Sequence, residues 1–228
     1  MSPVTRDDVL AARERIGDRL HHTPTFTSRM LAERLGAAVF LKGELFQRTG
    51  SFKPRGVLNV LASLTEEERA RGIVGISAGN HAQALAYCAG LEELDCRVVM
   101  WRGASEQKIE ATVAYGAEVD LTAADPAGAF ERLAELRAES GRVLVHPFDD
   151  PRTIAGQGTV GLELAEDAPG VSVVVVPVGG GGLVAGIAAA LPGVRVVAVE
   201  PERSPALHAA LAAGRVVHVE TASLADGL

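Results

Sequence analysis

Residues 171 to 187 read V-S-V-V-V-V-P-V-G-G-G-G-L-V-A-G-I, an apolar run that passes through four glycines into a helix. A continuous apolar run is typical of a strand that is buried on both faces of a parallel sheet. Glycines let a ligand come close to the backbone, and the free N–H groups at a helix start favour an anion. The stretch therefore predicts an α/β fold with a phosphate-binding loop at Gly179, Gly180, Gly181 and Gly182.

Two other interpretations of this loop stay open. The spacing Gly180-x-Gly182-x-x-Ala185, with Glu200 about 20 residues after the loop, fits a dinucleotide-binding fingerprint and predicts a NAD-binding oxidoreductase. This match is weak, because one glycine spacing followed by an acid occurs by chance in many α/β chains. A tight turn without a ligand is less favoured, since four successive glycines raise the entropy lost on folding.

The same alternation of strands and helices runs through most of the chain. After a predicted helix over 5–20 and a strand over 38–42, strands G-I-V-G-I-S, C-R-V-V-M-W, E-V-D-L-T and R-V-L-V-H-P alternate with helices from residue 73 onward. A second series begins with a helix at 151–165. We expect two doubly wound open sheets, with a smaller domain inserted in a larger one and a ligand in the cleft between them. The expected boundaries are residues 1–70 and 146–228 for the large domain, and 71–145 for the small α/β domain.

Composition restricts the class of protein. The chain has 228 residues, of which 47% are apolar, so it can bury a sizeable core. Its net charge of -7 argues against a nucleic-acid-binding protein and favours a small-molecule ligand. Cys88 and Cys96 lack the spacing of a metal site, which predicts reduced core thiols. Without an apolar signal core or a run of about 18 apolar residues, the sequence predicts a cytoplasmic protein that does not contact membranes.

A lysine stands at an unusual place in residues 49–56, T-G-S-F-K-P-R-G. Pro54 is suited to the first turn of a helix, so the Lys53 ammonium would lie against the positive end of the helix dipole. Burial at this place would lower the pKa of Lys53 and favour the neutral amine, the form that reacts with an aldehyde cofactor. A lysine that reaches into solvent is the alternative, and charge alone favours it.

A third strand-to-helix turn reads S-A-G-N-H over residues 77–81. Its N–H groups, with the side chains of Ser77 and Asn80, could hold a carboxylate. The alternatives are that Ser77 and Asn80 only cap the helix, and that His81 is a surface or capped histidine.

These three segments, in this order, resemble the pyridoxal-phosphate enzymes of the tryptophan-synthase-β fold, called fold type II. Within that group the chain is similar to the threonine/serine dehydratase and serine racemase family. Residues 41–49, L-K-G-E-L-F-Q-R-T, and residues 146–150 and 155–159, H-P-F-D-D and A-G-Q-G-T, extend the likeness to nearly the whole chain.

The resemblance implies a function and a set of roles. The function is β-elimination of L-threonine or L-serine, or both, to a 2-oxo acid and ammonia. Lys53 would carry the pyridoxal 5'-phosphate covalently and take the proton from Cα, with Phe52 beside the cofactor ring. The other implied roles are a hydrogen bond from Asn80 to the ring hydroxyl oxygen, phosphate binding by Gly179, Gly180, Gly181 and Gly182, and a grip on the substrate carboxylate by Ser77, Gly79, Asn80 and His81.

Two positions depart from related enzymes. Racemases of this family usually have a second serine where this chain has Ala78, which cannot carry a proton. We therefore expect elimination, with a racemase or another 3-hydroxy amino acid lyase as the alternative. The family's metal site pairs a Glu with an Asp six positions later, but here Glu200 is followed by Ala206, so we expect no metal.

The resemblance also implies that the C-terminal part of the large domain is missing, because the chain stops at residues 223–228. Removing those elements would expose apolar sheet and helix faces. We expect a weakly stable and poorly active chain, with an inactive ligand-binding fragment as the alternative. Family members form homodimers or homotetramers, which predicts a homo-oligomer for the intact protein.

Overall fold

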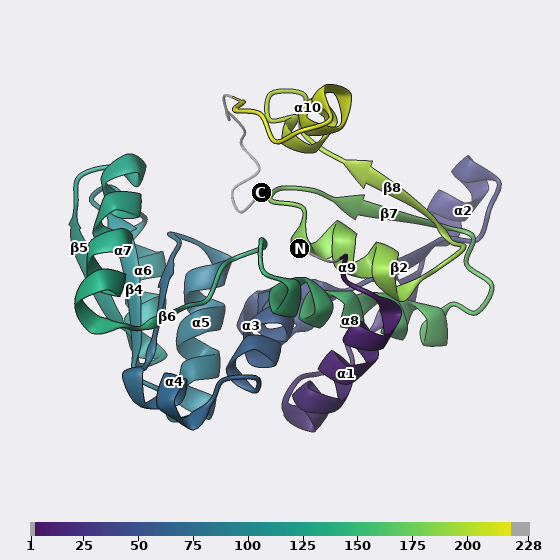
Figure 1. Cartoon of the computed structure of the whole chain (residues 1–228). Coiled ribbons are helices and arrows are strands. Elements are labelled where there is room, and N and C mark those ends of the chain that lie inside the picture. The colour runs from purple at the N-terminus through teal and green to yellow at the C-terminus, as the bar shows by residue number, and fades with distance from the viewer. Residues whose placement is uncertain (1–2, 220–228) are drawn as a thin grey trace.

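The computed structural model describes residues 3 to 219, which form three sheets with helices around them (Figure 1). One sheet has four parallel strands in the order β5-β4-β3-β6. Its strands are β3 (Ile73–Ile76), β4 (Cys96–Trp101), β5 (Glu118–Ala123) and β6 (Val143–Leu144). The helices in this part are α4 (Glu66–Arg71), α5 (Asn80–Leu91), α6 (Glu106–Ala114) and α7 (Pro126–Ser140).

The other two sheets have two strands each. A parallel pair joins β7 (Val173–Pro177) to β8 (Arg195–Val199), and an antiparallel pair joins β1 (Thr25–Thr27) to β2 (Phe40–Lys42). Their helices are α1 (Arg6–Ile16), α2 (Arg29–Leu35), α3 (Lys53–Leu61), α8 (Pro151–Asp167), α9 (Gly182–Ala190) and α10 (Ala206–Ala213). Short 3-10 turns are η1 (Gly17–Arg19), η2 (Glu44–Phe46) and η3 (Arg48–Gly50).

The predicted α/β class with parallel sheets is confirmed. The strands outside the four-stranded sheet form two separate pairs, and β1, α2 and α4 were not predicted. The helix signals were present: Ser28 caps α2, and Thr65 and Glu68 form a capping box at α4. β1 has only three residues, which is too short to show an alternating pattern.

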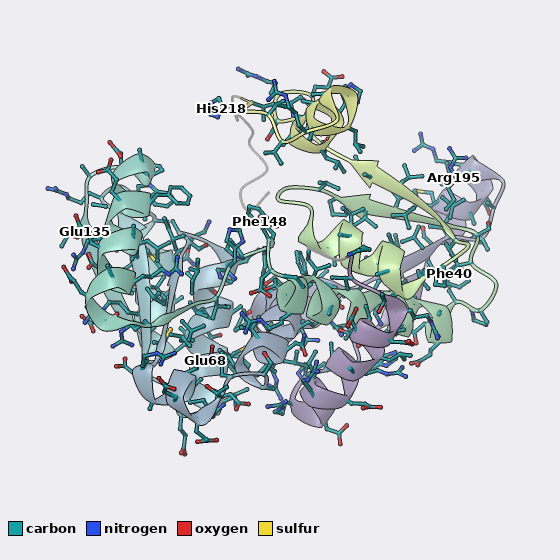
Figure 2. All side chains as sticks on the ribbon, viewed as in Figure 1. Phe40, Glu68, Glu135, Phe148, Arg195 and His218 are labelled. Atoms are coloured by element: carbon teal, nitrogen blue, oxygen red, sulfur yellow. The ribbon has the colours of Figure 1, made fainter. Side chains whose placement is uncertain are left out.

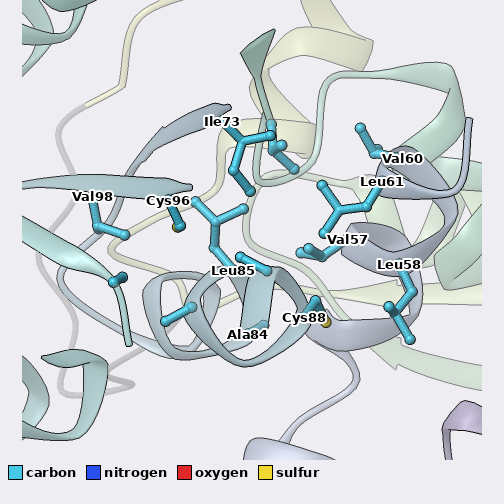
Figure 3. Packing of buried hydrophobic residues seen from close by; sticks show 14 of the residues in the cluster. Val57, Leu58, Val60, Leu61, Ile73, Ala84, Leu85, Cys88, Cys96 and Val98 are labelled. Carbon is cyan, nitrogen blue, oxygen red and sulfur yellow. The ribbon is translucent and has the colours of Figure 1, made fainter. Parts of the chain in front are cut away.

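Helix α3 lies in a core that it shares with the four-stranded sheet. Figure 3 shows side chains of α3, among them Val57 and Leu61, beside Leu85 and Cys88 of α5. Every residue of α3 after its first is buried. Helix α3 therefore packs on α8 as well as on α5 beside the four-stranded sheet. The domain boundaries at residues 70 and 145 stay a prediction.

The cysteine prediction is confirmed. Cys88 and Cys96 are free and buried. Burial raises the pKa of the Cys96 thiol to about 12 and that of Cys88 well above its ordinary value. Neither thiol is suited to nucleophilic chemistry, because the reactive form is the thiolate.

Helix α8 is packed backbone to backbone against two other helices. A Cβ on Gly156 would lie 2.5 Å from the carbonyl oxygen of Arg55 on α3. A Cβ on Gly186 of α9 would lie 2.3 Å from the carbonyl oxygen of Ile154 and 2.5 Å from the nitrogen of Gly158. Only glycine allows this approach, so α3 and α9 are fixed relative to one another through α8 (Figure 1).

We predict that Gly186→Ala lowers the free energy of unfolding by about 2 kcal/mol or more, because the added methyl group forces the two helix backbones apart. Urea denaturation followed by circular dichroism measures this change. Gly90→Ala is the matched control: Gly90 is also in a helix, but its Cβ would meet only the Tyr115 carbonyl oxygen at 3.4 Å. The better helix propensity of alanine should leave that variant as stable as the parent or slightly more stable. Equal losses in both variants would contradict the role of close packing.

A buried network of charges lies beside α8. Arg55 contacts Glu163 at 2.6 Å and Glu44 at 2.8 Å, and Lys42 contacts Glu163 at 2.7 Å and Asp167 at 2.9 Å. Although burial raises the pKa of Glu163, hydrogen bonds from Arg55 and Lys42 hold it below its ordinary value. The network connects β2, η2, α3 and α8, so it fixes the segment that leads to Lys53.

We predict that Arg55→Met lowers the free energy of unfolding by about 3 kcal/mol, since it leaves the half-buried carboxylate of Glu44 without a cation and the buried carboxylate of Glu163 with Lys42 alone. The control is Arg13→Met, which removes an exposed pair with Glu166 and should cost about 1 kcal/mol or less. Both values come from urea denaturation. Similar losses in the two variants would show that the network contributes no more than a surface pair.

The pair β7 and β8 has an open apolar face in the described structure. Val173, Val175 and Val199 are exposed, whereas Val174 and Val176 of β7 are buried. Residues 223–228, where the resemblance predicts the loss of the large domain's end, lie outside the described residues. In residues 3 to 219, none of the helices has both the length and the apolar character for a bilayer crossing.

Candidate active site

Lys53 is the first residue of α3 and follows a strained turn. Thr49, with φ 61°, and Gly50, with φ 72°, are both in the left-handed region, which is costly for threonine. Lys53 Nζ donates to the carbonyl oxygen of Pro147 at 3.0 Å and lies 5.2 Å from the centre of the Phe52 ring. Burial lowers the pKa of Lys53 to about 8. The predicted shift is thus confirmed, and the solvent-exposed alternative is wrong.

The turn between β3 and α5 leaves a helix start open. The N–H of Gly79 donates to Ser77 Oγ at 3.1 Å, so the serine orders the turn. Gly79 is the N-cap of α5, and no side chain in the described structure caps its first turn. Asn80, exposed as the first helical residue, is therefore not a cap. The N–H groups at this end of α5 are available to an anion such as a carboxylate.

The side chain of His81 points into the interior. It is buried, and its Nε2 lies 2.9 Å from the carbonyl oxygen of Val145. Burial, with a smaller effect of Lys53, lowers the pKa of His81 to about 3, so the ring is neutral and Nε2 donates. The interpretation of His81 as a surface histidine is wrong, and its ring is capped by the Val145 carbonyl. Any contact of His81 with a carboxylate in the turn has to come from its backbone N–H.

The glycine loop also ends at an uncapped helix start. Gly181 is the N-cap of α9 with φ 86°, and no described side chain caps that helix. A Cβ on Gly180 would lie 2.2 Å from the Phe148 ring, and one on Gly182 would lie 3.0 Å from the Phe148 backbone. Figure 2 shows Phe148 between the part that holds the four-stranded sheet and the part that holds β7 and α9. Glycine is thus required here by both space and backbone angle.

The three predicted segments meet at residues 145–148, between β6 and α8. Val145 accepts a hydrogen bond from His81, Pro147 accepts one from Lys53, and Phe148 packs on Gly180. The intervening carbonyl, that of His146, accepts from Thr153 Oγ1 on α8 at 3.1 Å. The H-P-F-D-D motif at residues 146–150 was part of the family resemblance, but the sequence predicted no role for it. Backbone carbonyls carry no residue-specific signal, so only the fold identifies this contact.

The described geometry argues against the nucleotide interpretation of Glu200. Its two carboxylate oxygens accept the N–H groups of Leu207 at 2.7 Å and His208 at 2.9 Å. Glu200 therefore caps α10 and is not directed at a ribose. In the described structure, no group of three or more His, Cys, Asp and Glu side chains is placed to hold a metal ion.

Two cavities lie around α1, α3 and α8, away from Lys53. One has a volume of about 330 Å³ and is lined by residues that include His21, Arg55 and Glu163. The other has a volume of about 370 Å³ and is lined by residues that include Arg15 and Arg152. Neither of these two cavities is lined by Lys53 or by the glycine loop.

Comparison with known families agrees with this geometry. A family model described as "Pyridoxal-phosphate dependent enzyme" matches residues 16–228. The chain belongs to this family. The predicted resemblance and the cofactor, pyridoxal phosphate, are thereby confirmed.

Individual members of this pyridoxal-phosphate family are similar over almost the whole chain. The catabolic L-threonine dehydratase TdcB of Escherichia coli (strain K12) is 43% identical over 230 residues, which cover 99% of this chain and 70% of that protein. The structure of maize serine racemase has a TM-score of 0.96 with 35% identity, covering 100% of this chain and 70% of the other. The processed form of threonine deaminase isoform 2 from Solanum lycopersicum has a TM-score of 0.90 with 32% identity, covering 99% and 66%.

The residues of this chain fit the family's cofactor. The loop over 179–182 ends at the start of α9, whose uncapped N–H groups favour a phosphate. The buried Lys53 amine has the lowered pKa that a reaction with an aldehyde needs. Both groups contact adjacent residues, Pro147 and Phe148, so they lie at one place.

We predict that capture of pyridoxal phosphate by the cofactor-free chain becomes faster between about pH 7 and about pH 9 and then levels off, because only the neutral amine reacts and the pKa of Lys53 is about 8. An ordinary lysine would continue to gain rate up to about pH 10.4. Stopped-flow absorbance gives the rates, and borohydride reduction with peptide mapping locates the labelled lysine. Label on Lys42 or Lys108, or a rate that still rises above about pH 9.5, would contradict the assignment.

Proposed function

We propose that this enzyme is a lyase that uses pyridoxal phosphate to convert L-threonine or L-serine, or both, to a 2-oxo acid and ammonia. One observation carries the proposal: Lys53, a lysine with a lowered pKa, donates to the segment 145–148, which also contacts His81 near the start of α5 and the glycine loop before α9. The 43% identity to a catabolic L-threonine dehydratase supports the same activity. A nicotinamide enzyme would leave Lys53 without a role.

Several residues of this chain would hold the cofactor. The N–H groups at Gly179, Gly180, Gly181 and Gly182 would bind its phosphate, as the start of α9 favours an anion. Phe52, whose ring centre lies 5.2 Å from Lys53 Nζ, would flank the cofactor ring, and Asn80 would donate to the ring hydroxyl oxygen. Bound pyridoxal phosphate supplies an electron sink for the negative charge that develops at the substrate Cα.

The protein side chains then orient the substrate and move its proton. The turn of Ser77, Gly79, Asn80 and His81 binds the substrate carboxylate, with the His81 contribution coming from its N–H. Lys53 Nζ takes the Cα proton, since burial keeps the pKa of this amine close to neutral pH. The β-hydroxyl leaves as water, and a water molecule later hydrolyses the C–N bond, so serine yields pyruvate plus ammonia.

Serine racemization is the second candidate, because the maize serine racemase structure matches this chain with a TM-score of 0.96. A racemase needs an acid on the face of Cα opposite to its lysine. Ala78 has no group that can carry a proton, and it is next to Ser77, whose hydroxyl accepts the N–H of Gly79. The composition of this turn favours elimination.

We also infer that the intact protein is a cytoplasmic homodimer or homotetramer. Apolar side chains are exposed together on and around β1 and β2: Phe26 and Phe46 have ring centres 5.6 Å apart, and Phe40 and Leu41 are on the paired strand. Met30 on α2 is 66% exposed. An exposed apolar area of this kind is typical of a subunit interface. Light scattering of the purified chain measures its mass in solution.

We predict that the cofactor-loaded chain releases 2-oxobutyrate from L-threonine or pyruvate from L-serine, and that Lys53→Ala lowers this rate by at least about a thousandfold, because it removes both the cofactor anchor and the base. Product is measured by a coupled dehydrogenase assay. Glu200→Gln is the control, since it removes the carboxylate that a nicotinamide enzyme would need.

Two results would contradict the proposal. One is 2-oxo acid release that survives Lys53→Ala but is lost in Glu200→Gln. The other is complete conversion of L-serine to the racemate in deuterium oxide, with deuterium at Cα and no pyruvate, which would establish a racemase.

A further inference from the structure

The imidazole of His146 lies in the segment that Lys53 and the glycine loop both contact. The next residue, Pro147, accepts the hydrogen bond from Lys53 Nζ at 3.0 Å, and Phe148 after it packs on Gly180. The shape of this short bend therefore fixes the surroundings of the Lys53 amine.

The ring of His146 closes the bend over residues 146–149 by accepting from the bend's own backbone. Its Nδ1 accepts the N–H of Asp149 at 2.7 Å and the N–H of Phe148 at 3.3 Å. A ring nitrogen that accepts hydrogen bonds carries no proton, so the proton of the neutral ring is on Nε2. His146 thus acts on the following backbone as an asparagine does in an Asx turn. The protonated ring has no acceptor and cannot close the bend.

Two further contacts hold the 146–149 bend in place. The rings of His146 and Phe148 have centres 4.7 Å apart at an interplanar angle of 88°, which is an edge-to-face contact. The His146 carbonyl accepts from Oγ1 of Thr153, a fully buried residue of α8, at 3.1 Å. The bend is therefore anchored to α8 through its backbone and to the glycine loop through the Phe148 ring.

The groups around His146 favour its neutral form. The charged and titratable residues near it are Asp149, Asp150, Lys53 of α3, His81 of α5 and Arg152 of α8, which pairs with Asp150. Burial has the largest effect and lowers the pKa of His146, the two aspartates oppose this shift, and Lys53 adds to it. At neutral pH the ring is therefore the acceptor that the bend needs.

We propose that His146 is a positioning residue, whose unprotonated Nδ1 holds the 146–149 bend and so keeps the Pro147 carbonyl at Lys53 Nζ. This inference rests on the proposed function, because it takes Lys53 as the reactive amine. The contact with Pro147 places the bend against that amine, so the bend contributes to the burial that lowers the pKa of Lys53. Without the Nδ1 acceptor the bend opens, and water reaches Lys53.

The test uses the cofactor-free chain and two substitutions with opposite expectations. His146→Asn keeps an acceptor that closes the same bend as an Asx turn, and its amide does not titrate. His146→Leu removes the acceptor. His208→Leu is the matched control, because His208 is exposed on α10 and undergoes the same chemical change.

Nuclear magnetic resonance measures both parts of the proposal. Spectra of isotope-labelled imidazoles show which ring nitrogen carries the proton, and the signals of His146 are those that disappear in His146→Asn. Spectra of labelled lysine Cε atoms follow the titration of each amine. The chain has only three lysines, so the signal of Lys53 is identified by its absence from Lys53→Ala.

We predict that Nδ1 of His146 is unprotonated at about pH 7.5 and gains its proton only below about pH 6.5, the ordinary pKa of histidine. In His146→Leu the titration midpoint of Lys53 should rise by about one pH unit or more, toward the ordinary ~10.4 of lysine. His146→Asn and His208→Leu should titrate at Lys53 as the parent does. In the loaded enzyme, the rate with L-serine at about pH 7.5 should fall at least about fivefold in His146→Leu and change less than about twofold in His146→Asn.

Other outcomes overturn the proposal. A proton on Nδ1 at neutral pH would contradict the closed bend. An unchanged Lys53 midpoint in His146→Leu, or equal shifts in His146→Leu and His146→Asn, would show that the acceptor does not position the amine.

Two further measurements separate this proposal from other failures. If His146→Leu does not fold, the amide signals of Phe148 and Asp149 decide: they should shift in the parent as His146 gains its proton and stay constant in His146→Asn, and a constant signal in the parent overturns the proposal. The proposed function fails separately, if the parent takes no cofactor at Lys53 or yields no 2-oxo acid, and neither result alters the readouts on the cofactor-free chain.

Discussion

The close packing of α8 against α3 and α9 is the constraint on which the rest of the structure depends. Gly156 meets the backbone of α3, and Gly186 meets the backbone of α8, so the backbones of three helices come into close contact at these two glycines. The start of α3 carries Lys53, and the start of α9 carries the glycine loop. A methyl group at either crossing would move Lys53 relative to the glycine loop. The packing of these helices therefore determines the relative position of the two groups.

A second important feature is the hydrogen bonding of the backbone carbonyls between β6 and α8. Three successive carbonyls, those of Val145, His146 and Pro147, accept from side chains on α5, α8 and α3. Each carbonyl is thereby satisfied without a sheet, where β6 has already ended. The same contacts tie the part that holds the four-stranded sheet to the part that holds α8, at the place where Lys53 lies.

Local signals made much of this predictable. A lysine before a proline, a run of glycines after an apolar strand and a small-residue turn are each contained in about eight residues, so the sequence identifies them. The lowered pKa of Lys53 was also predicted, from its expected burial at the start of a helix. The inward direction of the His81 ring did not, because it depends on a carbonyl 64 residues away. For the same reason, the contact of Phe148 with Gly180 could be identified only from the fold.

The hydrogen bond from Lys53 Nζ to the Pro147 carbonyl has a consequence for cofactor affinity. Lys53 has one amine, and in the cofactor-free chain that amine already has an acceptor inside the protein. An incoming aldehyde has to displace this acceptor, so the Pro147 carbonyl competes with the cofactor for the Lys53 amine. The measured affinity is then the intrinsic affinity reduced by the population of chains in which this contact is closed. Any contact that stabilises the segment around Pro147 also controls how readily the enzyme becomes loaded.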